Sequence, residues 1–214
     1  MRLGKNRLGH VLSYPEGWVG RWILAPLWNR RNRALNLAAL RALKCQPDSR
    51  VLEIGCGGGD LLSRILSAHT DGIICGVDRA MSMLHATRRK QMQRGASNQL
   101  IVLQALAERL PYPAGCFDRV CSVNSLFYWE DPAQGLAEMV RVLGPAGRLV
   151  LVFTQREDLD QKSFASDLFC PDPAHMVHLL SGLGLQDVRV KSGRDRHRRF
   201  YCLSGEIKQH SVSG

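Results

Sequence analysis

Several features are scarce or missing in this sequence, and each excludes a class of protein. No apolar run reaches the ~18 residues that a transmembrane helix needs. Residues 1–8 are basic but lack the hydrophobic stretch and cleavage site of a secretory signal. The seven cysteines show no paired metal-ligand spacing, so we expect no metal site. Cys56, Cys75 and Cys121 lie in apolar runs and are expected to pack as small core residues in a reducing cytoplasm.

Acidic residues are also few: 19 acidic side chains face 29 lysines and arginines, which gives a net charge of +10. Such an excess is one way to attract nucleic acid or an anionic surface. The basic residues cluster at 30–33, 88–90 and 194–199. The second cluster follows a helical pattern whose opposite face is apolar, which is typical of a solvated face. Because no aromatic-interleaved basic strand or helix-turn-helix pattern is present, binding of nucleic acid is not expected.

The segment 51–60, Val-Leu-Glu-Ile-Gly-Cys-Gly-Gly-Gly-Asp, carries the most specific pattern. An apolar run ends in Gly55-x-Gly57-x-Gly59 and a helical pattern follows at once, which predicts a strand, a tight turn and a helix N-terminus. Glycines in such a turn let a ligand approach the backbone closely. A second apolar run, 72–77, ends at Asp78, an acidic residue placed about 20 residues further on to accept hydrogen bonds from ribose hydroxyls. The two pieces together predict a nucleoside site.

Two common nucleotide signatures are absent. The dinucleotide fingerprint G-x-G-x-x-G would place its third glycine where Asp60 stands, and a carboxylate there would repel a pyrophosphate. The phosphate-binding loop that ends in Lys and Ser or Thr is absent as well. A nicotinamide, flavin or nucleoside triphosphate is therefore disfavoured, and a cationic ligand without phosphate fits the acidic residues Glu53 and Asp60 better.

The pattern along the chain predicts a single domain over 1–214 without repeats, low-complexity stretches or linkers. Predicted helices are 32–43, 59–69, 80–94, 131–143 and 173–183, and predicted strands are 50–55, 72–78, 100–103, 117–123, 148–153, 185–192 and 198–206. Residues 144–147, Gly-Pro-Ala-Gly, are predicted to form a turn. Strands that alternate with helices indicate an α/β fold with a doubly wound, mostly parallel sheet, to which the last hairpin adds an antiparallel strand.

Four ordered motifs resemble class I S-adenosylmethionine-dependent methyltransferases, in particular the small-molecule enzymes related to quinone and sterol methylases (methyltransferase type 11). They are Val51–Asp60, Gly76–Asp78, the run 107–118 with Ala-Glu-Arg-Leu-Pro, and 136–148. The resemblance implies a Rossmann-like sheet of seven strands in the order 3-2-1-4-5-7-6, with the last strand antiparallel. It places S-adenosyl-L-methionine at the C-terminal edge of the first four strands. Residues 45–206 would form the core. Because residues 1–44 combine aromatics with glycines, they are expected to form a lid or cap over cofactor and substrate, or a tail that completes the core.

The resemblance also implies roles for individual residues. Glu53, Gly55, Cys56 and Gly57 would line the methionine part, Asp78 would hold the ribose, and Arg79 and Met83 would flank the adenine. Leu106, Ala107 and Glu108 follow the third strand, where the adenine edge is read. The family commonly has Gly-Asp before this Ala-Glu pair, but this chain has Ala105-Leu106, so Leu106 would pack on the ring while backbone groups read its edge. Asn124 would face the sulfonium and the acceptor.

Structural interpretations stand beside these roles. Glu53 can alternatively be interpreted as a structural carboxylate, and Asp78 as the cap of the helix that begins near Ala80, a role compatible with ribose binding. The aromatic run 127–129 is either packing or a substrate wall. His10, His85, His175, His178 and His197 show no metal spacing and are typical of surface or core histidines.

The function predicted from the sequence is methyl transfer from S-adenosylmethionine to a small-molecule acceptor by in-line displacement. An oxygen or carbon acceptor needs a general base, for which Tyr14, His10 and His175 are the candidates. Three alternatives stay open: methylation of a lipid or quinone in weak association with a membrane surface, a cofactor-binding partner protein without catalysis, and an RNA-modifying enzyme. No pattern in the sequence specifies an oligomeric state.

Overall fold

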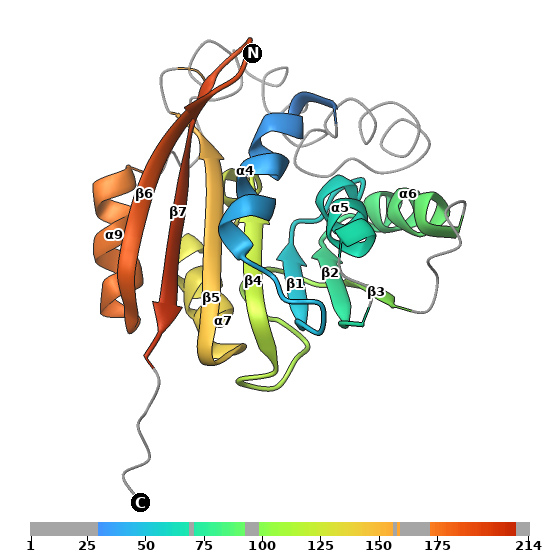
Figure 1. Ribbon diagram of the computed structural model, residues 1–214, viewed down its shortest axis with the longest axis horizontal. Helices are drawn as coiled ribbons and strands as arrows, with labels where there is room; N and C mark the ends of the chain where they lie inside the picture. The colour runs from blue at the N-terminus through green and yellow to red at the C-terminus, as the bar shows by residue number, and fades with distance from the viewer. Residues whose placement is uncertain (1–29, 69–70, 93–98, 156–157, 159–171, 209–214) are drawn as a thin grey trace, which may run out of the picture.

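A seven-stranded sheet forms the middle layer of the molecule (Figure 1). The computed structural model describes residues 30–68, 71–92, 99–155, 158 and 172–208. The strand order is β3-β2-β1-β4-β5-β7-β6. The strands are β1 (Val51–Ile54), β2 (Ile74–Asp78), β3 (Leu100–Gln104), β4 (Phe117–Val123), β5 (Leu143–Thr154), β6 (Leu185–Arg194) and β7 (Arg199–Ile207).

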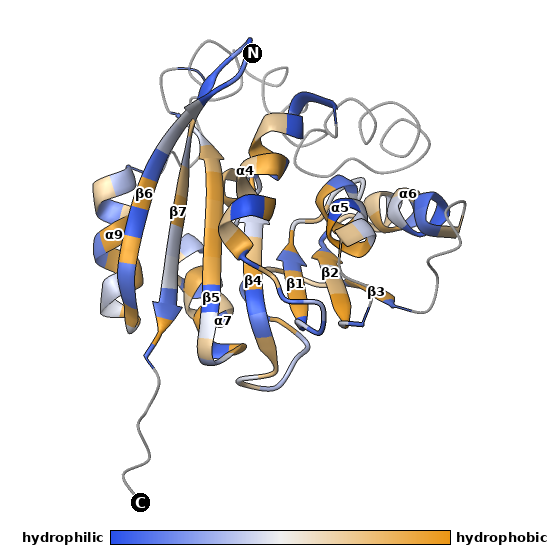
Figure 2. Cartoon of the chain, viewed as in Figure 1, coloured by the Kyte–Doolittle hydropathy of each residue, from blue (hydrophilic) through white to orange (hydrophobic). Residues whose placement is uncertain are grey.

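The strand pairing confirms the predicted fold. The neighbours from β3 to β5 all pair in parallel, and β7 pairs antiparallel with both β5 and β6. All four residues of β1 are buried, as expected for a central parallel strand covered on both faces. Figure 2 shows the same contrast in hydropathy: β5 is hydrophobic along most of its length, whereas the edge strand β6 carries many hydrophilic residues.

Helices cover both faces of the sheet. Side chains of α4 (Arg33–Leu43), α5 (Asp60–Ala68) and α6 (Met81–Met92) join one buried cluster. Those of α7 (Pro132–Arg141) and α9 (Pro173–Gly182) join the cluster on the other face. Asp131 and Asp172 cap α7 and α9 by accepting a backbone N–H from the third residue of each helix, and a proline follows each cap. A short 3-10 helix, η2 (Leu126–Tyr128), follows β4.

The predicted turn at 144–147 is wrong. The structure assigns these residues to β5, which begins at Leu143 because Leu143 already pairs with Phe117 of β4. The register then shifts between Phe117 and Arg119, and Ala146 takes the left-handed backbone conformation with φ of 57°. The Gly-Pro-Ala-Gly sequence thus makes an irregularity within a strand rather than a turn before one.

Much of the predicted lid, residues 1–29, lies outside the described residues. Within 1–44 the structure describes α4, which packs against β4, β5 and β7, and its residues Leu35, Ala39 and Leu43 are fully buried. This helix therefore belongs to the core layer. The prediction that Cys56, Cys75 and Cys121 are core residues is confirmed by their burial. Among the residues described, no helix has the length and apolar character needed to cross a membrane.

Candidate functional site

The candidate site lies where the strand order reverses. The chain leaves β1 toward β2 and leaves β4 toward β5, so the connections after these two neighbouring strands diverge. In open parallel sheets ligands bind in the crevice at such a switch point, outside the carboxyl ends of the strands. The two strand ends are tied together by Ser125, whose hydroxyl donates to the carbonyl of Ile54 at 3.2 Å.

Three of the four glycines after β1, namely Gly55, Gly57 and Gly59, have positive φ angles, but their neighbours differ. A Cβ at Gly55 would lie 2.4 Å from the Cβ of Ser125, so this glycine allows the ends of β1 and β4 to touch. A Cβ at Gly59 would lie 2.6 Å from Thr87, whose hydroxyl donates to the carbonyl of Gly57. At Gly57 a Cβ would meet nothing within 4 Å. Packing explains Gly55 and Gly59, whereas Gly57 faces open space, as close approach of a ligand requires.

Asp78 ends β2 and connects the glycine loop to α6. One carboxylate oxygen accepts the backbone N–H of Gly57 at 2.8 Å, and the other accepts that of Ala80 at 2.9 Å. Burial raises the pKa of Asp78, and these two amide bonds oppose the rise. The bond to Ala80 ties Asp78 to the residue directly before α6, in line with the structural interpretation of this side chain. Each carboxylate oxygen keeps a further lone pair, so the same group can still accept ribose hydroxyls.

Glu53 is a carboxylate buried in the sheet immediately before the glycine loop. Its side chain is almost fully buried, and its Oε2 atom has no hydrogen-bond partner among the described residues. Burial raises the pKa of Glu53 well above its usual range, and the nearby carboxylates of Asp60 and Asp78 raise it further. A backbone hydrogen bond from Leu62 and the charge of Lys90 oppose this rise. A buried carboxylate oxygen without a partner is costly, and a cation placed beside Oε2 would remove that cost.

The sequence position of Asp60 predicts a carboxylate that repels a pyrophosphate, but the structure shows that its charge is compensated. Its carboxylate accepts hydrogen bonds from Arg64 at 2.8 Å and from Asn36 at 3.0 Å, and it lies 3.4 Å from the ammonium of Lys90. Burial opposes ionisation of Asp60, but these partners outweigh it and lower its pKa. Because the charge is compensated within the protein, repulsion by Asp60 is a weak argument against pyrophosphate. Glu53 carries the unpaired acidic character of the site.

Arg79 and Met83, the residues predicted to flank an adenine, follow Asp78 in the sequence, and Met83 lies in α6. The guanidinium of Arg79 donates to the carbonyl of Tyr128 at 2.7 Å and lies 3.9 Å from Glu130. Arg79 therefore bridges the end of β2 to the segment after β4. Met83 is buried in α6 against Ala80 and Ala86. Cys56 is also buried, and its sulfur points at Gly76 of β2, so only its backbone is available to a ligand in the loop.

Residues 106–108 follow β3. The side chain of Leu106 is exposed, whereas those of Ala107 and Glu108 contact other parts of the protein. Leu106 is 41% exposed, which leaves an apolar side chain available at the sheet edge. Ala107 is buried in the core. Glu108 accepts the backbone N–H groups of Glu130 and Asp131, so its carboxylate fastens the start of α7.

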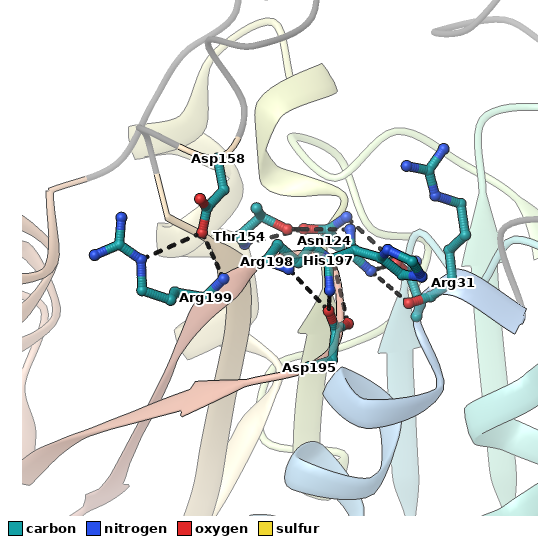
Figure 3. A network of polar contacts seen from close by, with 9 residues as sticks. Arg31, Asn124, Thr154, Asp158, Asp195, His197, Arg198 and Arg199 are labelled. Carbon is teal, nitrogen blue, oxygen red and sulfur yellow. Dashed lines mark hydrogen bonds and ion pairs between the residues drawn. The ribbon is translucent and has the colours of Figure 1, made fainter.

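Asn124 ends β4 in a left-handed conformation, with φ of 56°. Its Oδ1 accepts from both the backbone N–H and the hydroxyl of Thr154, and its amide group donates to Asn32 at 3.4 Å. Figure 3 shows Asn124 and Thr154 beside Arg198, which comes from the tip of the β6–β7 hairpin. No sequence signal points to this cluster, because residues 32, 124, 154 and 198 share no motif.

The aromatic run 127–129 has two interpretations, packing or a substrate wall, and packing accounts for two of its three residues. Phe127 is buried in the core, and the ring of Trp129 packs where a Cβ of Gly135 would lie, at 2.5 Å. Tyr128 is partly buried; burial raises the pKa of its hydroxyl, while the charge of Arg198 lowers it. Phe127 and Trp129 are thus packing residues, and Tyr128 lies near the guanidinium of Arg198.

The predicted general bases receive no support from the described geometry. Tyr14 and His10 lie outside the described residues. His175 is exposed in the first turn of α9, which packs against β6 and β7 rather than near β1. Among the described side chains no group of three or more histidine, cysteine or acidic residues could hold a metal ion.

Comparisons with known proteins agree with this architecture. Residues 52–151 match a family described as a methyltransferase domain. A demethylmenaquinone methyltransferase from Thermus thermophilus is 36% identical over 57% of this chain and 52% of its own length. A ubiquinone/menaquinone biosynthesis C-methyltransferase from Vibrio campbellii is 34% identical over 77% of this chain and 60% of its own length. The chain thus spans little more than half the length of these curated relatives.

The fold alone does not fix the reaction. The solved structure of a (4+2)-cyclase has a TM-score of 0.73 to this chain at 17% sequence identity, covering 85% of this chain and 84% of the other. The matched domain, the two relatives and the strand order nevertheless agree with the four sequence motifs. On these grounds the chain resembles the class I S-adenosylmethionine-dependent methyltransferases of the small-molecule type.

Proposed function

We propose that this protein transfers a methyl group from S-adenosylmethionine to a small-molecule acceptor. The observation that carries the proposal is the unpaired Oε2 of Glu53, buried next to a glycine loop in which Gly57 faces open space. The cofactor fits this pair of features because it carries an ammonium and a sulfonium and has no phosphate. Its cationic methionine part would lie over Gly57 and compensate the carboxylate of Glu53.

The remaining parts of the cofactor have candidate partners along the same edge. The carboxylate of Asp78 would accept the ribose hydroxyls with the lone pairs that Gly57 and Ala80 leave unused. Leu106 would cover one face of the adenine, and Met83 and Arg79 would border it. Glu108 is engaged by two backbone amides, so its contribution would be to hold the segment 106–110 in place.

The bound cofactor supplies an activated methyl group, and the protein's own residues supply position and environment. Methyl transfer is an in-line displacement in which the sulfonium charge disperses, so no protein nucleophile is needed. Holding the two reactants in line is worth up to roughly 7–11 kcal/mol of the barrier. The apolar strand ends around Gly55 and Ser125 would favour dispersal of the charge by excluding water.

Two experiments test the proposal. Calorimetry with S-adenosylmethionine and with NADH should show binding of the first only. Incubation of the protein with cofactor labelled in the methyl group and a metabolite extract should then give a labelled small molecule, identified by its mass. Cofactor binding without any labelled product would instead favour a binding protein, or a reaction without methyl transfer such as that of the cyclase with the same fold. Binding of NADH in preference would contradict the proposal outright.

A further inference from the structure

A closed ring of hydrogen bonds surrounds Asn124, which occupies the end of β4 beside the glycine loop. Arg198 donates to the hydroxyl of Thr154 at 3.2 Å, and that hydroxyl donates to Oδ1 of Asn124 at 2.8 Å. The amide of Asn124 and the guanidinium of Arg198 both donate to Oδ1 of Asn32, at 3.4 and 2.6 Å. Figure 3 shows Asn124, Thr154 and Arg198 of this ring close to Arg31, which lies just before α4.

The ring fixes which way the amide of Asn124 points. The backbone N–H of Thr154 can only donate, so the atom that faces it at 3.1 Å must be the amide oxygen of Asn124. With the Thr154 hydroxyl as second donor, this oxygen has both lone pairs occupied. Asn124 can therefore offer a ligand only its NH₂ group. One hydrogen of that group points to Asn32, and the other has no acceptor in the described part of the chain.

Arg198 is built into this position rather than lying on the surface. Its side chain is only 9% exposed. The hairpin tip is shaped around it: Asp195 accepts the backbone N–H groups of His197 and Arg198 and lies 3.6 Å from the guanidinium. The guanidinium also donates to the carbonyl of Arg31 at 2.6 Å. A buried arginine held on three sides fixes the groups that it touches.

The charges around Asn124 have a consequence for the acceptor. Arg31 and Arg198 bring positive charge to this end of the sheet, and the carboxylate of Asp195 is paired with Arg198. An amine acceptor becomes an ammonium as it receives the methyl group, and these cations oppose that change. An oxyanion loses its negative charge in the same step and is stabilised beforehand by a cation and an N–H donor.

We propose that Asn124 donates its free amide N–H to an oxygen of the methyl acceptor, and that Arg198 is a positioning residue that holds this amide through Thr154 and Asn32. This inference rests on the proposed function. The acceptor is then a phenol, enol or carboxylic acid. After its proton leaves to solvent, the oxyanion, or the carbon conjugated with it, forms a bond to the methyl carbon. The electron pair of the broken bond to carbon returns to sulfur, and a carbon acceptor then releases its own proton to solvent.

The first test is the identity of the product that the full-length protein forms from labelled S-adenosylmethionine and a metabolite extract. We expect the label on oxygen or on a carbon next to a carbon that bears oxygen. A label on an amine nitrogen or a thiol sulfur would overturn the inference and leave the proposed function intact. If the protein neither binds the cofactor nor labels a product, the proposed function itself fails.

The second test uses variants with the same labelled mixture. Asn124→Asp keeps the size of the side chain but replaces its donor, and should lower the rate of labelling by roughly 100-fold, as for the loss of one preorganised donor. Arg198→Met should lower it by about tenfold, and the milder Arg198→Lys should recover part of the loss. Arg199→Met is the matched control, because Arg199 is the neighbouring, half-exposed arginine of the same hairpin. Cofactor affinity should stay unchanged in all four.

A double-mutant cycle separates positioning from a general effect on stability. If Arg198 acts through Asn124, Arg198→Met should change the rate less than about twofold in an Asn124→Ala background, because the contact that it supports is already gone. Equal, additive losses in both backgrounds would refute the positioning role. Unchanged labelling by Asn124→Asp would refute the donor role. Thermal melts and cofactor binding identify any variant that is unfolded, in which case Thr154→Val takes the place of Arg198→Met.

Discussion

The carboxylate of Asp78 accepts the backbone N–H of Gly57 at 2.8 Å and that of Ala80 at 2.9 Å, so one side chain holds both the glycine loop and the start of α6. The two interpretations of Asp78 in the sequence, ribose ligand and helix cap, are compatible, because each oxygen can accept more than one hydrogen bond.

We expect Asp78→Ala to weaken S-adenosylmethionine binding by about 1.5–3 kcal/mol, or roughly 10- to 100-fold, because hydrogen bonds to a charged group are lost. Asp172→Ala is the matched control: it removes a cap from α9, on the other side of the sheet, and should cost about 1 kcal/mol of stability without changing affinity. Calorimetric titration and thermal melts of both variants give the comparison. Equal affinity of Asp78→Ala and the wild type would rule out the ribose contact.

Glu53 makes stability and cofactor binding depend on pH in opposite directions. Its pKa in the folded protein is raised above the ordinary value of 4.5. The folded protein therefore holds a proton that the unfolded chain has lost, and stability falls as the pH rises above that value. Cofactor binding should instead strengthen with pH, because a cation binds the ionised carboxylate. Calorimetry in buffers of different ionisation enthalpy should detect the released proton.

Glu53→Gln tests the same group by substitution. It should raise the free energy of unfolding at pH 8 by about 1–3 kcal/mol, the cost of an unsatisfied buried group, and remove the part of the pH dependence that Glu53 causes. It should also weaken cofactor binding. Glu206→Gln, at a half-exposed position paired with Arg148, is the control and should do neither. Destabilisation of Glu53→Gln at pH 8 would show that the carboxylate has a structural partner after all.

The glycines of the loop should respond differently to alanine. Gly57→Ala has space for its Cβ and should cost about 1–2 kcal/mol for its left-handed backbone, yet weaken cofactor binding about tenfold or more. Gly55→Ala places its Cβ 2.4 Å from that of Ser125 and should cost about 2–4 kcal/mol of stability. Adding Ser125→Gly to the Gly55→Ala variant should recover the part of the stability loss that comes from this contact. Denaturant unfolding and calorimetry distinguish the two, and identical behaviour of both variants would contradict the prediction.

Glu138 of α7 fastens the segment that follows β3. Its carboxylate accepts the backbone N–H of Leu110 at 2.8 Å and pairs with Arg141, which also donates to the carbonyl of Tyr112. Glu138→Ala should lower the free energy of unfolding by about 1–3 kcal/mol, because it leaves a buried N–H unpaired. The hydrogen bond from Arg141 lowers the pKa of Glu138, so its contribution is complete above the ordinary value of 4.5 and is lost as the pH falls through the lowered value. Urea unfolding at pH 7 and at pH 3 should show the difference between variant and wild type shrinking at the lower pH.

The regular parts of the fold could be predicted because their signals are local. The apolar run 117–123 coincides with β4, and Asp131-Pro132 marks the start of α7, since burial and capping act within a few residues. The segment 144–147 could not, because Gly, Pro and Ala favour a turn locally, and only the partner strand, through the pair Phe117 and Leu143, draws them into β5.

Some features of the candidate site could likewise be predicted from the sequence, and others could not. The glycine loop and Asp78 form a contiguous pattern, so their positions could be predicted. The unpaired oxygen of Glu53 could not, because it depends on neighbours from α5 and α6 that compensate Asp60 instead. Arg198 reads in the sequence as one member of a charged, solvated run. Only the tertiary structure shows that it is buried against Asn32 and Thr154.

The bond between Arg198 and Asn32 joins residues 166 positions apart. During synthesis β1, β2, β4 and the glycine loop emerge from the ribosome well before the last hairpin does. The residues proposed to hold the cofactor are therefore synthesised earlier than Arg198, which lies in the half that would meet the second substrate. A chain that stops before residue 194 would lose β7, the strand that pairs with both β5 and β6, so the crevice can be completed only after the last hairpin has been made.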